Sequence, residues 1–406
     1  MARRGSKRTA KSPAKAAVAT GHPLEAVLEA DPDDDASFLV YTDHLLAEGD
    51  PRGELAAVQR ALETRRDDAL LRREHELLDR HRPAMLGMLA ELPGYRVRWR
   101  YGHVDRLEIA EPYGSRPGPG EAIADLLHRP AARFLREVAI RHSTFPPAQE
   151  VSRVSIDYVL ARAGEVVSAL AAAPRPALRA IELGEREIDA QVALGEEGRD
   201  YLSHGFGDVG NLERLWRAAP RLERVLLSGG WMELGSLALP AVRDFELRQS
   251  NLRTENLHAM LAARWPTLER LSLWIGAHDN WERAAYAGAG PSELAPLLDP
   301  RRFPALRSLG LVSTMNTHEV LDVVLRSELL PQLTELDLGG GTLGDNHVAA
   351  IVRARSRLAH LTRLDLRWNL FGLETARRAF EGTNVVFDPQ RFHRSYLQPR
   401  FNACQE

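Results

Sequence analysis

Leu333-Thr334-Glu335-Leu336-Asp337-Leu338 is the stretch that decides the fold, because its pattern Leu-x-x-Leu-x-Leu returns along the whole 406-residue chain. A proline usually stands two residues before the pattern, as Pro331 does here. Eight copies have the apolar triplets Leu135-Val138-Ile140, Leu178-Ile181-Leu183, Leu222-Val225-Leu227, Val242-Phe245-Leu247, Leu268-Leu271-Leu273, Leu306-Leu309-Leu311, Leu333-Leu336-Leu338 and Leu361-Leu364-Leu366, and Val104-Leu107-Ile109 is a weaker, earlier copy.

The triplets indicate short strands that share one core. In each copy the three apolar residues point inward, while the residues between them alternate outward. One such unit cannot bury its apolar face alone, but stacked parallel units can. Successive copies begin 43, 44, 20, 26, 38, 27 and 28 residues apart, and four of these intervals fit the period of about 20 to 29 residues of leucine-rich repeats. The sequence therefore predicts an α/β leucine-rich-repeat solenoid over residues 94–390, a curved parallel sheet with helices on its outer side.

Residues 21–93 have a different, helical periodicity, and we expect them to form a small all-α domain. Leu55, Val58 and Leu62 mark the inward face of one of its helices. The acidic run 31–35 is expected to be a turn whose last carboxylate, Asp35, caps the following helix. A calcium loop is the alternative, but the sixth and twelfth positions of that run lack the glycine and the glutamate that such a loop needs.

Two segments of the chain carry a family resemblance, one in this domain and one in the repeats. Glu48-Gly49-Asp50-Pro51-Arg52-Gly53-Glu54, followed by Leu55 and Gln59, resembles the bacterial repeat-companion domain, a family known chiefly as an N-terminal partner of repeats in myxobacteria and planctomycetes. Its usual Ala-Asp-Trp-Leu stretch is replaced by Thr42-Asp43-His44-Leu45. Residues 265–370 are similar to a bacterial leucine-rich-repeat family of unassigned function. These resemblances imply an architecture and no catalytic activity.

The charge distribution is uneven. Residues 1–20 carry six basic residues and no acid, so the net charge of −3 leaves −3 − 6 = −9 on the rest. We expect this tail to be disordered, with nucleic-acid contact through its charge as an alternative. The single Cys404 suits a reducing cytoplasm, and no signal peptide or membrane span is readable. We therefore expect a cytoplasmic protein that is monomeric alone, with residues 391–406 capping the last repeat.

Catalytic and cofactor motifs are weak or absent. Gly339-x-Gly341-x-x-Gly344, with Asp365 about 20 residues later, matches a dinucleotide-binding pattern. Because Asp337 and Asp365 occupy the same place in successive repeats, repeat turns explain these glycines better. His75 and His81 lack a third zinc ligand. No nucleophile elbow or phosphate-binding loop is present, so we expect no enzyme activity, no metal and no cofactor.

The outward residues of the strands are the candidate site, and the hypothesis is a receptor or scaffold that holds a protein partner on the concave face. The expected contact residues are Arg224, Glu246, Arg248, Arg270, Trp274, Asp337, Arg363, Asp365 and Arg367. An exposed Trp274 between arginines on adjacent strands is typical of a binding hot spot.

Two alternatives to this hypothesis stay open. The alternating charges fit ion pairs between neighbouring strands without any ligand, and Trp274 fits packing against the insertion at 275–303. The protein also fits an accessory role in an enzyme system, acting through its long loops at 184–215 and 275–303.

Overall fold

The computed structural model describes residues 22–110, 117–141, 156–184, 208–229, 231–249, 252–275, 289–314 and 316–387. The predicted tails at 1–20 and 391–406, residues 185–207 of the first insertion and residues 276–288 of the second insertion lie outside these residues. The predictions about the tails therefore stay predictions.

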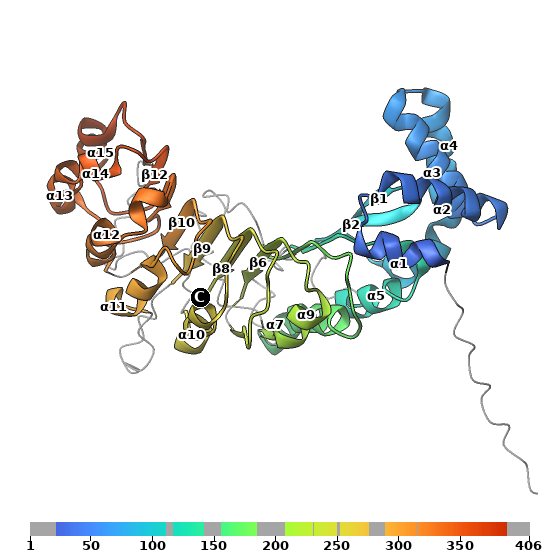
Figure 1. The fold of residues 1–406 in the computed structure, drawn as a ribbon, viewed down its shortest axis with the longest axis horizontal. Coiled ribbons are helices and arrows are strands. Elements are labelled where there is room, and N and C mark those ends of the chain that lie inside the picture. The colour runs from blue at the N-terminus through green and yellow to red at the C-terminus, as the bar shows by residue number, and fades with distance from the viewer. Residues whose placement is uncertain are drawn as a thin grey trace, which may run out of the picture.

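An eleven-stranded sheet forms the body of the protein (Figure 1). Strands β1 and β2 pair antiparallel, and every other neighbouring pair is parallel. In spatial order the strands are β1 (Tyr95–Arg100), β2 (His103–Ile109), β3 (Glu137–Ile140), β4 (Ala180–Leu183), β6 (Arg224–Ser228), β8 (Asp244–Arg248), β9 (Arg270–Trp274), β10 (Ser308–Val312), β11 (Glu335–Asp337), β12 (Arg363–Asp365) and β13 (Val385–Val386). The predicted α/β class with a large, mainly parallel sheet is confirmed, and a strand lies at each of the nine apolar copies.

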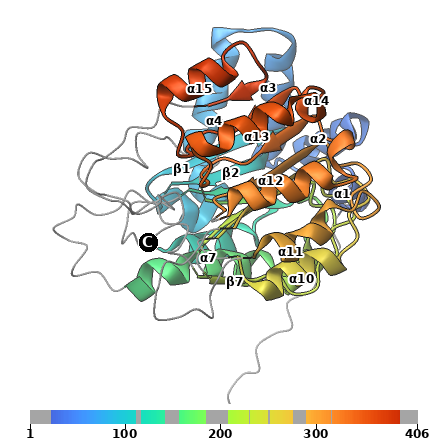
Figure 2. The same ribbon diagram turned by 90° about the vertical axis from the view of Figure 1, so that its left-hand side faces the viewer.

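Helices make most of the connections between the parallel strands, and the connection from β6 to β8 instead contains the short strand β7 (Trp231–Glu233). Figure 1 shows α7, α9, α10 and α11 along one side of the sheet, and the view along the long axis in Figure 2 places α7, α10 and α11 on the same side. The connecting elements are α5 (Pro119–Leu126), η2 (Pro130–Ala132), α7 (Ile156–Leu170), α9 (Glu213–Ala218), α10 (Thr254–Ala262), α11 (Pro291–Leu294), η4 (Ala295–Leu298), α12 (Thr317–Arg326), η5 (Leu330–Gln332), η6 (Asp345–His347), α13 (Val348–Arg353), α14 (Arg355–Leu358) and α15 (Leu373–Phe380).

The apolar residues of the repeats stack in register. Leu309 pairs with Leu336, and Leu336 pairs with Leu364 on the next strand. All three side chains are at most 1% exposed. Burying a leucine side chain contributes about 1.5–3 kcal/mol, so each short strand is held mainly by the leucines of its neighbours.

One predicted loop is partly regular structure. The insertion expected as a loop over 184–215 ends in a strand, β5 (Asp208–Asn211), and in the start of α9. β5 pairs with β7 (Trp231–Glu233) in a separate two-stranded parallel sheet. Val209 and Leu212 are fully buried, which explains why this segment is ordered.

The N-terminal helices are α1 (Pro23–Ala30), α2 (Asp35–Ala47), α3 (Pro51–Thr64), α4 (Asp68–Leu86) and η1 (Gly87–Glu91).

The prediction that Asp35 caps α2 was wrong by one residue. Asp34, and not Asp35, accepts the backbone N–H of Ser37 at 3.1 Å and caps α2. Asp35 is the first helical residue, and its carboxylate accepts hydrogen bonds from Arg100 and Tyr101 instead.

The motif at residues 48–59 docks these helices on the hairpin β1–β2. The two-residue turn of this hairpin, Tyr101-Gly102, has positive φ at both positions, as a tight hairpin turn requires. The backbone N–H of Gly102 donates to the side chain of Gln59 at 2.9 Å, and Arg52 Nη1 lies 3.1 Å from His103 Nε2. A Cβ at Gly102 would approach the carbonyl oxygen of Arg52 to 2.2 Å. The motif residues therefore act at a helix–sheet junction.

Replacing Leu336 by Asp should destabilise the C-terminal repeats strongly. The side chain is 1% exposed, and an unpaired carboxylate in a packed core costs about 3 kcal/mol or more. Urea and thermal unfolding followed by circular dichroism would measure the loss. Val352→Asp is the control because Val352 on α13 is 47% exposed. Equal melting of both variants would contradict the repeat packing.

Candidate partner-binding face

The register of the parallel strands arranges outward side chains in rows on the inner face, which we define as the sheet face opposite α7, α9, α10 and α11. One row contains Arg106, Glu137, Ala180, Arg224, Asp244, Arg270, Ser308, Glu335 and Arg363. A second row, two residues further along each strand, contains Glu108, Ala139, Glu182, Leu226, Glu246, Ser272, Gly310, Asp337 and Asp365. Acidic and basic residues alternate along most of the first row.

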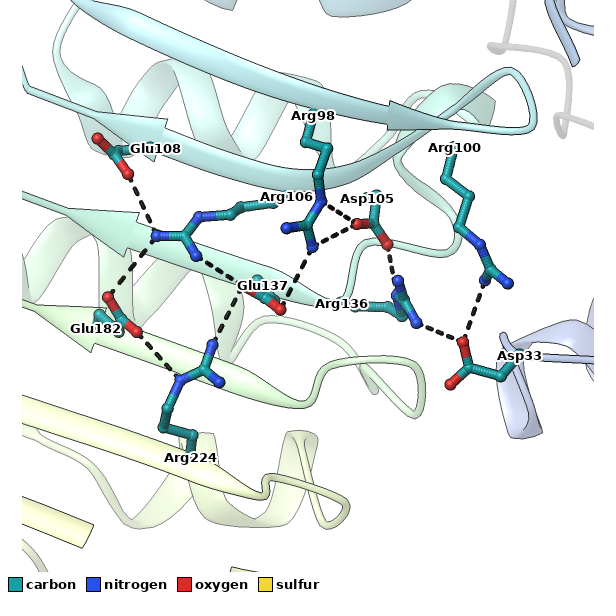
Figure 3. Close-up of polar contacts among 10 residues, drawn as sticks. All are labelled: Asp33, Arg98, Arg100, Asp105, Arg106, Glu108, Arg136, Glu137, Glu182 and Arg224. Atoms are coloured by element: carbon teal, nitrogen blue, oxygen red, sulfur yellow. Dashed lines mark hydrogen bonds and ion pairs between the residues drawn. The ribbon is translucent and has the colours of Figure 1, made fainter. Parts of the chain in front are cut away.

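Ion pairs bind the first strands together across this face (Figure 3). Arg106 contacts Glu137 at 3.0 Å on the neighbouring strand. Arg224 also reaches Glu137, at 3.2 Å, and Glu182 at 3.1 Å. The strand between Arg224 and Glu137 carries only Ala180 in this row, so a small side chain leaves room for an arginine to reach two strands away.

The network continues to the N-terminal helices. Asp105 accepts from Arg98 at 2.6 Å and from Arg136 at 2.5 Å, and Arg136 also contacts Asp33 at 2.5 Å (Figure 3). Burial raises the pKa of Asp105, but the hydrogen bonds from Arg136 and Arg98 outweigh it and hold that pKa below its ordinary value. Asp33, which lies between α1 and α2, therefore ties the helices to the sheet through Arg136 and Arg100.

The later strands also carry ion pairs, and most of these join residues of the same repeat. Arg270 contacts Asp244 at 3.1 Å and Arg248 contacts Glu246 at 2.7 Å. Arg363 and Arg367 both contact Asp365, each at 2.7 Å. Seven of the nine expected contact residues thus lie in ion pairs within the chain: Arg224, Glu246, Arg248, Arg270, Arg363, Asp365 and Arg367. The alternative of ion pairs between neighbouring strands is present at Arg224 and Arg270. The other five residues pair within their own repeat, and contact with a partner stays a prediction.

Asp337 differs from the other acids of its row. Its half-buried carboxylate accepts the backbone N–H of Gly339 at 2.8 Å, and among the described residues no arginine lies within ion-pair distance. Burial, and then the nearby carboxylate of Asp365, raise the pKa of Asp337 to about 7. Beside it in the first row, Glu335 is exposed and accepts a hydrogen bond from Ser308 at 3.1 Å. Among the described residues, Glu335 and Asp337 therefore have no arginine partner.

The expectation of an exposed Trp274 is wrong. Its side chain is only 6% exposed and packs with Val312 and Trp368. The guanidinium of Arg248, itself buried, lies 5.0 Å from the ring centre of Trp274. A strand position shows which face a side chain points to, but not whether that face is covered. The expected neighbour Trp231 lies in the separate sheet and is 52% exposed, with Arg253 above its ring, and Trp281 lies outside the described residues.

The glycine pattern at 339–344 belongs to a repeat turn. A Cβ at Gly341 would lie 2.2 Å from Thr317 Oγ1, and one at Gly340 would lie 2.8 Å from Ser313 Oγ. The next repeat contributes Asn369, whose side chain accepts from the backbone of Leu343 at 2.9 Å. Neighbouring repeats thus fill the space that a cofactor phosphate would need, which supports the turn interpretation.

Within the described residues, no group of three or more His, Cys, Asp or Glu side chains is placed to hold a metal. His75 is exposed and pairs with Asp79 at 3.1 Å. None of the helices in that part of the chain combines the length and apolarity needed to cross a bilayer.

The N-terminal half of the charged face is not among the residues expected from the sequence. Arg106 and Glu137 stand at the same place of the early copies as Arg224 does in its own copy, and Glu182 stands at the place of Leu226. Extending the same positional rule to those copies would have found them. Asp33 has no such signal, because its contact with Arg136 depends on how the helices dock.

Comparisons with known proteins give only distant likenesses. No protein-family model and no curated protein matches the chain. Among 41 matching chains of solved structures, a Bacteroides fragilis protein from a structural genomics consortium is 20% identical with a TM-score of 0.49, and the match covers 67% of this chain and 71% of that one. A chain of the TLR13–ssRNA13 complex is 15% identical with a TM-score of 0.35, covering 71% of this chain and 33% of the other. Likenesses this remote support no argument about function.

Replacing Asp337 by Asn should stabilise the protein above neutral pH. The pKa of Asp337 is about 7 in the folded chain, against an ordinary value of 3.8. The folded state therefore binds the proton of Asp337 more tightly than the unfolded state does. The contribution of this proton to the free energy of unfolding is complete below about pH 4 and is lost as the pH rises through 7. Asn cannot ionise, so the melting temperature of the variant should exceed the parent's by about 2 °C or more at pH 8. The difference in melting temperature between the variant and the parent should grow between pH 4 and 7 and stay constant above pH 7.

Asp365→Asn is the matched control, since it stands at the same place in the next repeat. Burial raises the pKa of Asp365, but hydrogen bonds from Arg367 and Arg363 hold it below the ordinary value. This variant should melt lower than the parent at pH 8. A similar loss of melting temperature in Asp337→Asn would show that its carboxylate is satisfied in the fold.

Replacing Trp274 by Ala should lower the free energy of unfolding by about 3 kcal/mol, because a buried tryptophan leaves a large cavity. Trp231→Ala is the control and should change it by about 0.5 kcal/mol or less, as expected for a surface residue. Chemical denaturation of both variants would measure the difference. A Trp274→Ala protein as stable as its parent would restore this residue as an exposed anchor.

Proposed function

We propose that the chain is a leucine-rich-repeat solenoid of the repeat-companion type that binds a protein partner on its inner face without catalysing a reaction. The strand at each apolar copy and the single stacked core support the solenoid assignment. The docking role of Arg52 and Gln59 supports the companion domain as an integral cap of the first repeat.

The observation that carries the binding proposal is the array of charged side chains over β8–β12. Arg270 and Arg363 point outward from this array with side chains 55% and 46% exposed. Glu335 and Asp337 lie between them on β11. An array of both signs offers complementary charges to a partner, which favours orientation and specificity over raw affinity.

Neutralising the exposed arginines tests this proposal. The double variant Arg270→Gln, Arg363→Gln should capture its partner from native lysate about tenfold less well, because arginine contacts are frequent hot spots. Its melting temperature should change little, since exposed ion pairs contribute about 1 kcal/mol or less. Quantitative pull-down with mass spectrometry would measure the capture.

The matched control is Arg355→Gln, Arg357→Gln on α14, where both arginines are exposed. This control should capture the partner normally. Nuclease treatment of the lysate tests the alternative that the basic residues of the tail at 1–20 contact nucleic acid. If the Arg270→Gln, Arg363→Gln variant captures the partner normally but nuclease abolishes capture, nucleic-acid contact through the tail replaces the protein-partner proposal.

A further inference from the structure

A cleft of about 270 Å³ lies far from the charged rows of β8–β12, where the connections into β3 and β4 meet helix α1. Part of its wall is apolar and is formed by Leu135, Leu170 and Leu178. Three arginines, Arg129, Arg133 and Arg175, also line the cleft, together with Glu29 from α1. An apolar wall with a few charged side chains beside it is typical of small-ligand sites.

Two of these guanidinium groups are already occupied. Arg129 contacts Asp125 at 2.9 Å and donates to the carbonyl oxygen of Ala84 at 2.8 Å. Arg133 contacts Glu29 at 2.9 Å and also pairs with Glu25. These bonds fix both side chains and neutralise them, so they shape the cleft more than they attract a ligand.

Arg175 has no such partner. Its Nε atom is buried and makes no hydrogen bond, and no carboxylate of the described residues lies within ion-pair distance of its guanidinium. Its own backbone N–H donates to Ala218 at 2.6 Å, and prolines 174 and 176 flank it. Burial lowers the pKa of Arg175, with Glu29 acting in the opposite direction. A cation held in place and partly desolvated without a partner is costly, and an anion in the cleft would offset that cost.

We propose that this cleft binds a small carboxylate with an apolar body, its carboxylate paired with Arg175 and its body against the leucine wall. The planar fork of a guanidinium matches the two oxygens of a carboxylate. The leucines provide the apolar contact, and the cleft has room for a ligand of several heavy atoms. A free metabolite and the C-terminal residue of a peptide share this chemistry. The proposal is independent of the inner face.

Isothermal titration of the full chain with N-acetyl-leucine tests the site, with N-acetyl-leucinamide and inorganic phosphate as comparison ligands. The acid should bind, whereas the amide should bind at least tenfold more weakly because it lacks the charge. Phosphate should also bind more weakly because it lacks the apolar body. Equal binding of acid and amide, or of acid and phosphate, would overturn the proposal. A peptide ending in leucine that binds better than N-acetyl-leucine would identify the source as a chain terminus.

Arg175→Gln should weaken N-acetyl-leucine binding about tenfold or more, and Arg175→Lys should lie between that variant and the parent because it keeps the charge without the fork. Neither variant should lower the melting temperature much, since the side chain of Arg175 has no hydrogen bond or ion pair to lose among the described residues. Arg301→Gln, an exposed arginine outside the cleft, is the control and should bind normally. Unchanged binding in Arg175→Gln would rule the site out, and a large drop in its melting temperature would assign Arg175 a structural role instead.

Discussion

The structure depends on one constraint, the in-register stacking of short parallel strands whose apolar side chains cannot be buried by one strand alone. Strands β11 and β12 have only three residues each. Their leucines lie directly above one another at the spacing of neighbouring strands, about 4.8 Å. Each repeat is therefore stable only with its neighbours, and the same register that aligns the leucines also aligns every outward side chain. The charged rows are a consequence of the core.

Because neighbouring strands are so close, charged side chains aligned on the inner face interact strongly with one another. Like charges side by side on neighbouring strands would repel, and the first row avoids this by alternating sign or by inserting small residues such as Ala180 and Ser308. In the second row Asp337 and Asp365 do stand side by side, and this raises the pKa of Asp337. Arginine suits the arrangement because its long side chain can contact acids on two strands at once, as Arg224 does with Glu137 and Glu182. The face is thus largely self-neutralised, and this self-pairing also links the N-terminal helices to the first repeats through Asp33.

The sequence predicts what the repeat pattern encodes and little beyond it. The pattern fixes strand positions and which residues point inward, so all nine strands at the apolar copies were predictable. The strand β5 was not, because it has no repeat signal and depends on contacts with β7 and α7. The burial of Trp274 was not predictable either, since it depends on Val312 and Trp368, which the folded chain brings together from other repeats. Ion pairs between residues two strands apart were not predictable for the same reason, since they depend on how far each side chain extends in the folded chain.

A largely self-paired surface limits how a partner can bind. An incoming charge must compete with an existing ion pair, and such an exchange contributes little net free energy because each exposed pair is itself worth about 1 kcal/mol or less. The contacts that need no such exchange lie where the pairing is incomplete. On the inner face this place is β11, where Glu335 and Asp337 have no arginine partner among the described residues. The pKa of Asp337 near 7 means that a basic group on a partner would also favour its ionised form. Recognition at β11 would then couple to proton release, whereas binding over the paired residues of β3–β6 would not.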